Sequence, residues 1–387
     1  MLEHAREIAP KIIEWRRQFH MHPELGFEEY QTAARVAQVL TELGYRVRTG
    51  VGRTGVIGEK GQGKPTIAIR ADMDALPIQE TNQVPYASQV PGKMHACGHD
   101  AHTAIVLGVA MLLAEEDLPG TVRLLFQPAE EVADEENKSG APRMIEDGAM
   151  ENVEAVLALH VDAHTAVGDI RIGSGPSSGG VDNFTATIIG KGGHGARPHE
   201  VVDPIWIAAH VIFALNGIIS RRIDPFAPAV ISIGSIHAGD AENVIPDQVR
   251  LSGTIRYMDP QVQQQIHQEI EKALSVARLF GGDYQLRIDL SDPPMINDEQ
   301  VVRFLEQVAG DLLGKEHVLP PKRGLGAEDF GQFSKLAPGA MFGLGCLIEG
   351  DERTHHNPRF DIDERCLPIG AAILAEATVR FLQKGGL

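Results

Sequence analysis

The amino-acid sequence predicts an α/β protein with a mainly parallel sheet in one domain and a smaller domain inserted into it. Short apolar runs alternate with helical segments in the first 182 residues, an order typical of parallel sheets with helical crossovers. From residue 183 onward, strand-like segments alternate apolar and polar residues, as in a sheet with one covered face. The chain of 387 residues exceeds the ~250–300 residues that one hydrophobic core usually serves, which favours two domains.

The first domain is expected to open with two helices and to continue into buried strands. Residues 2–43 place apolar side chains at helical spacing, Pro23 and Gly26 divide this stretch, and Gly44 ends it. Three short apolar runs predict buried strands, at 66–70, 122–126 and 155–159. Helices are predicted between them, at 101–116 and 141–147. Helix and strand signals resume near Asp298, so we assign residues 1–182 and 297–387 to this catalytic, metal-binding domain.

The second domain is expected to follow the order β-α-β-β-α-β, the split βαβ arrangement of ferredoxin-like domains. Its strands are predicted at 184–189, 229–236, 248–257 and 283–288, and its helices at 204–220 and 260–279. This order of elements begins just after Asp182 and is complete before the signals of the first domain resume near Asp298. Residues 183–296 therefore form an inserted domain in this prediction.

Composition excludes several classes of partner. The chain has 35 Lys and Arg against 53 Asp and Glu, a net charge of -18, which argues against nucleic acid or an anionic membrane. The longest uninterrupted apolar stretch, Ala104 to Ala114, is shorter than the ~20 residues of a membrane span, and no signal-peptide pattern opens the chain. The three cysteines have no framework spacing and suit a reducing cytoplasm, so we expect a cytoplasmic protein.

The segment 94–102 carries the most informative chemistry, because it places one thiol, three imidazoles and a carboxylate within nine residues. Such groups hold first-row transition metals. In folds with parallel strands, site residues gather where the strands end. Three predicted strands are each followed by candidate residues there, which are Asp72 with Asp74, Glu130 with Glu131, and His160.

Each of these residues alone has an ordinary structural explanation. A lone Cys97 is more often a small core residue, and Glu130 with Glu131 is more often a solvated acidic pair, since further acids follow. His160 is as readily a structural histidine held by hydrogen bonds as it is a metal ligand. Their joint placement favours a pair of divalent ions, for which a thiolate can be the bridging ligand. One glutamate can then bind metal while the other acts as general base, with Asp74 orienting a ligand or that base.

Sequence motifs extend this interpretation almost from end to end. They lie at 20–29, 70–77, 94–102, 127–131, 192–196, 198–199, 243–247, 253–256, 326–330, 356–358 and 360–361. With these motifs the chain resembles the metal-dependent amidohydrolases of the aminoacylase and carboxypeptidase superfamily. It resembles most the branch of hippurate hydrolases, indole-acetyl-amino acid hydrolases and N-acetyldiaminopimelate deacetylases.

The resemblance implies a complete two-metal site in the first domain. Its ligands fall on Cys97, His99, Glu131, His160 and His356, with Cys97 as the bridge. Glu130 falls on the general base, and Asp74 supports the site. Two divalent ions per subunit are implied, Mn or Zn foremost, with Co or Ni as alternatives, since ligand softness does not choose among them.

The resemblance also gives the inserted domain a role as lid and dimer surface, so a homodimer or higher homo-oligomer is implied. His194, supplied by a partner subunit, would stabilise the oxyanion. Asn243 would contact the substrate, and Arg256 would bind the substrate carboxylate bidentately. Without the motif, Arg256 would be read as an ordinary surface residue.

These residues together predict hydrolysis of the amide bond of an N-acyl-L-amino acid, with an acetyl, benzoyl or similar acyl group. A dipeptidase or aminopeptidase on the same site is the first alternative, and Asp162 is its one candidate for binding a free amine. A thiol enzyme with Cys97 as nucleophile is the second. A catalytically silent binding protein is the third, and the complete ligand set argues against it.

Some positions depart from the pattern of the branch, and they put substrate preference in doubt rather than the chemistry. These are Asp162 and His164 after His160, the stretch 177–180, and Arg197.

Overall fold

The computed structural model describes residues 1–351 and 353–387, which form two compact units. The first unit contains residues 1–177, 296–322 and 329–387. The second contains residues 178–295 and 323–328. It therefore takes in residues 323–328, which the sequence analysis placed in the first domain. The reason is local, because the amide of Gly179 donates to the carbonyl of Gly326 at 2.8 Å.

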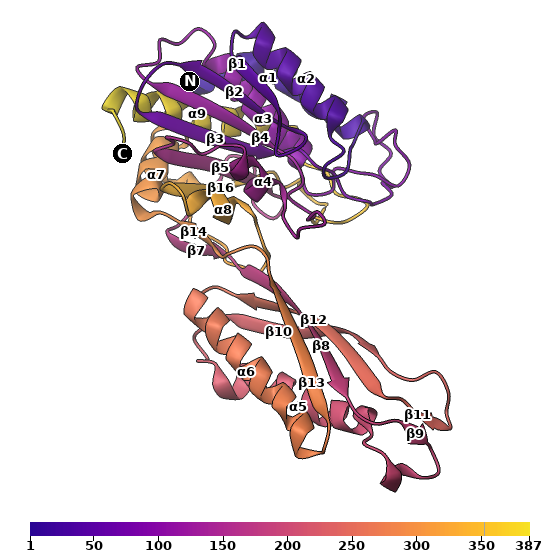
Figure 1. Cartoon of the computed structure of the whole chain (residues 1–387). Helices are drawn as coiled ribbons and strands as arrows, with labels where there is room; N and C mark the ends of the chain where they lie inside the picture. The colour runs from indigo at the N-terminus through magenta and orange to yellow at the C-terminus, as the bar shows by residue number, and fades with distance from the viewer. Residues whose placement is uncertain (352) are drawn as a thin grey trace. The chain divides into compact units, whose positions relative to one another are not determined.

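The first unit is built on one eight-stranded sheet (Figure 1). Its strand order is β1-β2-β4-β3-β5-β16-β6-β15. The strands are β1 Arg46–Val51, β2 Gly55–Gly61, β3 Thr66–Asp72, β4 Thr121–Gln127, β5 Ala155–Asp162, β6 Ile170–Arg171, β15 Val318–Leu319 and β16 Gly339–Gly345. The central strands β4, β3, β5 and β16 are parallel, while β1 and β2 join one edge antiparallel. The predicted α/β class with a mainly parallel sheet is confirmed.

Helices cover this sheet and close its core. They are α1 Leu2–Met21, α2 Tyr30–Glu42, α3 His99–Leu112, α4 Gly140–Glu146, α7 Glu299–Leu313, α8 Phe330–Ser334 and α9 Leu367–Lys384, with 3-10 turns at Lys315–His317 and Glu364–Cys366. Helices α1, α3 and α9 pack against one another. Every residue of α3 except Met111 is buried, which explains why its sequence is apolar on all sides from Ala104 onward. The amino end of this buried helix carries His99.

The second unit has its own sheet and its own core. Its sheet order is β10-β12-β8-β13, and all three pairings are antiparallel. The main elements are β8 Gly180–Ile189, α5 Pro204–Arg222, β10 Ala229–His237, β12 Gln248–Tyr257, α6 Pro260–Leu279 and β13 Asp283–Leu290. Its short elements are β9 Gly193–His194, which pairs with β11 Val244–Ile245, and a 3-10 turn at Pro198–Glu200. Strands β7 Gly175–Ser178 and β14 Met295–Asn297 pair with each other where the chain passes from one unit to the other and back. Helices α5 and α6 each bury one apolar face in the core of this unit, while Trp206 and Phe213 of α5 stay exposed.

Two helices in the described part of the chain are long and apolar enough to cross a membrane by length and composition alone, α5 and residues 364–384. The sequence analysis measured only uninterrupted apolar runs and did not find them. In residues 364–384, 72% of the apolar window is buried, and in α5 33% is buried. Both helices contribute buried residues to the core of their own unit, so this finding is weak evidence for a membrane.

Candidate metal centre

The residues expected to hold a metal converge on the edge of the first unit's sheet where its parallel strands end. Asp72 is the last residue of β3, and Asp74 follows two positions later. Glu130 and Glu131 lie in the loop after β4. Since β3 and β4 are parallel neighbours, their carboxyl ends meet at this edge.

His160 lies inside β5, which corrects the strand end predicted at Leu159. The strand continues to Asp162 because its last residues still pair with β16. Nδ1 of His160 donates to the carbonyl oxygen of Val161 at 2.8 Å. Because a carbonyl can only accept, the proton lies on Nδ1, and Nε2 is directed at Sγ of Cys97, 3.4 Å away.

Cys97 and His99 stand on either side of a glycine that the geometry requires. Gly98 has a φ of 102°, a conformation that side chains disfavour. A Cβ atom at this position would also lie 2.4 Å from Cγ2 of Val161. The turn at Gly98 therefore sets the thiol just before α3 and the imidazole of His99 at its first residue.

The buried thiol and imidazole shift each other's ionisation. Burial opposes a charged thiol, yet the imidazoles of His160 and His99 hold the pKa of Cys97 well below its usual range. Burial likewise opposes a charged imidazole, yet Asp72 and Cys97 raise the pKa of His99 well above its usual value. The site thus stabilises a thiolate beside cationic groups, the form in which cysteine binds metals.

Asp74 ties two parts of the site together, as a supporting residue should. Its Oδ1 lies 3.1 Å from Nδ1 of His99, and its Oδ2 accepts from the amide of Glu131 at 3.0 Å. The side chain is 1% exposed. Asp74 therefore fixes the ring of His99 and the backbone of Glu131 at the same time.

His356 reaches the cluster from the C-terminal loop. Its φ is 58°, and its amide donates to the carbonyl of Ala96 at 2.8 Å. Its Nε2 lies 2.9 Å from Oε1 of Glu131. Hydrogen bonds to Cys97 and Glu131 raise the pKa of His356 to about 10.

The donor atoms form overlapping groups in which all atoms lie within 4.8 Å of one another. Three of these groups hold the expected residues: Cys97 with His99 and His160, Cys97 with Glu131 and His356, and His99 with Glu130 and Glu131. Two more adjoin them, Asp72 with His99 and His102, and Glu130 with Glu328 and Asp329. The structure thus brings together the five expected ligands and the expected base. Nε2 of His99 is buried and has no hydrogen-bond partner among the described residues. Thiolate, imidazole and carboxylate donors around an unsatisfied ring nitrogen fit a divalent transition metal.

The sequence analysis missed the buried ion network behind this cluster. Arg16 of α1 is fully buried and bonds Asp100 and Asp361, each at 2.9 Å. His20 lies 2.7 Å from Asp100 through Nδ1. The network joins α1, the start of α3 and the loop after His356. A charged residue at a buried helical position is the signal that could have revealed Arg16.

The second unit brings together only two of its three expected substrate residues. His194 on β9 lies opposite Val244 of β11, and the amide of Gly195 donates to the carbonyl of Asn243 at 2.8 Å. Arg256 instead lies near the other end of β12, roughly 25 Å along the strand at ~3.3 Å per residue. His194 and Asn243 are exposed.

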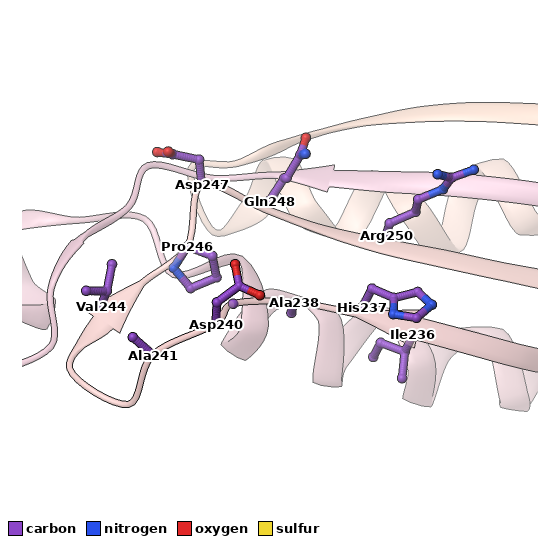
Figure 2. A pocket seen from close by; sticks show the side chains of 11 residues that line it. Ile236, His237, Ala238, Asp240, Ala241, Val244, Pro246, Asp247, Gln248 and Arg250 are labelled. Carbon is purple, nitrogen blue, oxygen red and sulfur yellow. The ribbon is translucent and has the colours of Figure 1, made fainter.

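A hollow of about 820 Å³ lies where the end of β10, the loop to β11 and the start of β12 meet (Figure 2). His237 and Arg250, which are cross-strand neighbours on β10 and β12, line it together with Asp240 and the loop to β11. The sequence analysis did not anticipate it, because it forms where three segments of the second unit meet.

The departures after His160 are accounted for by the loop that follows β5. Asp162 accepts from the amide of His164 at 2.9 Å and from the hydroxyl of Thr165 at 2.6 Å. Nζ of Lys322 lies 3.8 Å from the same carboxylate. Both carboxylate oxygens of Asp162 thus stabilise the turn that follows β5.

Comparison with known sequences places the chain among hydrolases. Residues 68–380 match the profile of peptidase family M20/M25/M40. The chain is 44% identical to a probable hydrolase of Synechocystis sp., covering 98% of each. It is 39% identical to the N-acetyl-L-cysteine deacetylase of Bacillus subtilis, covering 97% of this chain and 89% of the other. It is 38% identical to an IAA-amino acid hydrolase of Arabidopsis thaliana, covering 99% and 88%.

Solved structures share the whole architecture. A putative aminohydrolase from methicillin-resistant Staphylococcus aureus superposes with a TM-score of 0.94 at 35% identity, over 99% of both chains. A dinuclear metal-binding peptidase from Bacillus subtilis superposes with a TM-score of 0.86 at 33% identity, over 98% of this chain and 99% of the other.

Proposed function

The chain belongs to peptidase family M20/M25/M40, and from this premise we propose that it hydrolyses the amide bond of N-acyl-L-amino acids with the help of divalent metal. The observation that carries the proposal is the single cluster of thiol, imidazole and carboxylate donors at one sheet edge. The relatives named as deacetylase and amino acid hydrolase support the acyl-amino acid class.

Five residues would hold two divalent ions, with Mn or Zn as the first candidates and Co or Ni as alternatives. They are Cys97, His99, Glu131, His160 and His356, and Cys97 would be shared. When bound, such ions lower the pKa of a water molecule and polarise the substrate carbonyl. The named relative that binds two metals supports this number.

Glu130 would act as the general base. It lies beside Glu131 and shares a donor group with His99. In the reaction it takes a proton from the attacking water and gives it to the amine nitrogen as the carbon–nitrogen bond breaks. The products are the carboxylic acid of the acyl group and a free amino acid. Asp74 keeps His99 and Glu131 in place throughout.

Residues of the inserted unit would complete the site between subunits of a homodimer or higher oligomer. His194 and Asn243 lie at one end of the unit's sheet, while Arg256 lies toward the other. One small substrate does not span roughly 25 Å of strand, so the two sets would come from different subunits. His194 of a partner would then stabilise the oxyanion, and Arg256 would bind the substrate carboxylate.

The peptidase alternative rests on the family description and would need an acidic group for a free substrate amine. Asp162 was the one candidate, and its oxygens already accept from His164 and Thr165. This engagement favours an acylated substrate. We also keep a cytoplasmic location as part of the proposal, from the cysteine usage.

A substrate panel tests the proposal. Chelator-stripped protein is assayed with N-acetyl, N-benzoyl and indole-acetyl amino acids and with free dipeptides, with and without Mn²⁺, Zn²⁺ or Co²⁺. We expect metal-restored activity on one acylated class. Activity on dipeptides alone would establish the peptidase instead. Activity that survives chelation and is lost on alkylation would establish a thiol mechanism with Cys97 as nucleophile.

A further inference from the structure

His102 is a buried imidazole that the proposed reaction does not use. It lies three residues after His99 on α3, so both rings project from the same side of the helix. Its Nδ1 lies 2.6 Å from Oδ1 of Asp72. Its Nε2 accepts from the amide of Val161 at 3.0 Å. The ring is 1% exposed, so these two bonds define its environment.

The two partners allow His102 one protonation state. A carboxylate only accepts, so Nδ1 carries a proton, and a backbone amide only donates, so Nε2 carries a lone pair. The carboxylate of Asp72 is itself held by Arg70, whose guanidinium bonds it at 2.7 Å.

The backbone amide that donates to His102 belongs to Val161, the residue directly after His160. The ladder between β3 and β5 ends at the pair of Arg70 and Ala158, so β3 offers no partner to Val161. His102 supplies that partner from α3. The carbonyl of Val161 in turn accepts from Nδ1 of His160. Both polar groups of Val161 are thus fixed, one by each histidine.

We propose that His102 is a positioning residue that sets the direction of His160 toward Cys97 by holding the Val161 amide. Asp72 keeps His102 in the tautomer that can accept. This inference rests on the proposed function, because it assumes that His160 binds metal. The competing explanation is that His102 only stabilises the core.

Variants that separate the two bonds of His102 test the inference. In His102→Gln, the amide oxygen reaches the place of Nε2 and can still accept from Val161, whereas the shorter side chain of His102→Asn reaches only the place of Nδ1. Each metal-free, full-length protein is titrated with Co²⁺. The readouts are stoichiometry, affinity and the thiolate-to-cobalt absorption band, with the thermal midpoint of unfolding as control. We expect His102→Asn to weaken Co²⁺ binding by about 10–100-fold and His102→Gln to stay near wild type. Equal affinities in the two variants would overturn the inference.

A second measurement keeps the inference testable if His102→Asn does not fold. Nitrogen-15 spectra of wild-type imidazoles, assigned by difference from His102→Gln, should show His102 neutral with its proton on Nδ1 at pH 7. A proton on Nε2, or a cationic ring, would overturn the inference. Wild-type protein that binds no Co²⁺ and hydrolyses no acylated substrate would overturn the proposed function and this inference with it. Wild-type protein that binds two Co²⁺, with His102→Asn unchanged, would overturn only the inference.

Discussion

The two units hold their candidate site residues in opposite ways. In the first unit, Asp74 and His99 are buried, and each hydrogen bond fixes a neighbour in the cluster. In the second, His194 lies exposed on the short sheet of β9 and β11, and Asn243 lies exposed directly before β11. A buried cluster is arranged before any substrate arrives, whereas exposed side chains gain a defined environment only when another surface covers them. In the proposed function, the chemistry therefore belongs to the first unit, and a partner subunit completes the site.

The largest effect is expected from the base itself. Glu130→Ala should lower kcat by about 10²–10⁴-fold, because it removes the group proposed to take and return the proton. Metal content measured by elemental analysis should stay at the wild-type level, since Glu131 remains. Substantial turnover by this variant would remove Glu130 from the role of base.

The next effect concerns the exposed His194. His194→Ala should lower kcat by about 10²–10³-fold, the usual loss for one oxyanion donor. If His194 serves the partner subunit, mixing inactive His194→Ala and Glu130→Ala subunits should restore about a quarter of the wild-type activity. About half of randomly mixed dimers are then mixed, and each of these has one intact site. The two variants are unfolded and refolded together so that their subunits exchange between dimers. A mixture that stays inactive would place His194 and Glu130 in the same subunit's site.

A smaller effect concerns stability and pH. Burial and the charge of Asp74 raise the pKa of Glu29 from 4.5 to about 7. The protonated form is thus favoured in the folded protein, and its stabilising contribution is full below pH 4.5 and lost as the pH rises through 7. Glu29→Gln keeps an acceptor for the amide of Ala129, which Glu29 bonds at 2.8 Å. Denaturant unfolding measures this effect. As the pH rises from 4.5 to 7, the free energy of unfolding of Glu29→Gln should increase relative to that of wild type by up to about 3 kcal/mol. A difference that stays constant with pH would contradict the raised pKa.

The smallest effect is expected at Arg197, one of the departures from the family pattern. Its guanidinium lies 3.7 Å from Glu200, and both side chains are more than half exposed. Arg197→Ala should change the free energy of unfolding by less than about 1 kcal/mol. A changed KM in the substrate panel, with stability unaltered, would instead show that Arg197 contacts substrate.

The sequence predicted elements well where local signals are strong. Helix α6 is predicted to the residue because Asp259 caps it and Pro260 begins it. The strand pair β1 and β2 was missed because β1 is mostly exposed and polar, as an edge strand can be. The end of β5 was misplaced at Leu159 because a histidine and an aspartate continue the strand, where pairing with β16 decides the conformation.

At the site, the candidate metal ligands could be predicted from the sequence, but the hydrogen bonds that hold them could not. Cys97, His99 and His160 stood out because metal chemistry limits the residue types. The bond from Asp72 to His102 joins residues 30 positions apart, and that from Arg16 to Asp100 joins residues 84 apart. Such pairs depend on how strands and helices stack, which a single sequence does not specify.

One further consequence follows from where the chain leaves and re-enters the first unit. The departing strand β7 and the returning strand β14 are paired, so the insert begins and ends at adjacent points of the scaffold. A short linker could therefore join β7 to β14 in place of residues 179–294, and a different insert could be grafted there. The segment between β7 and β14 can therefore vary while the buried cluster of the first unit keeps its own contacts.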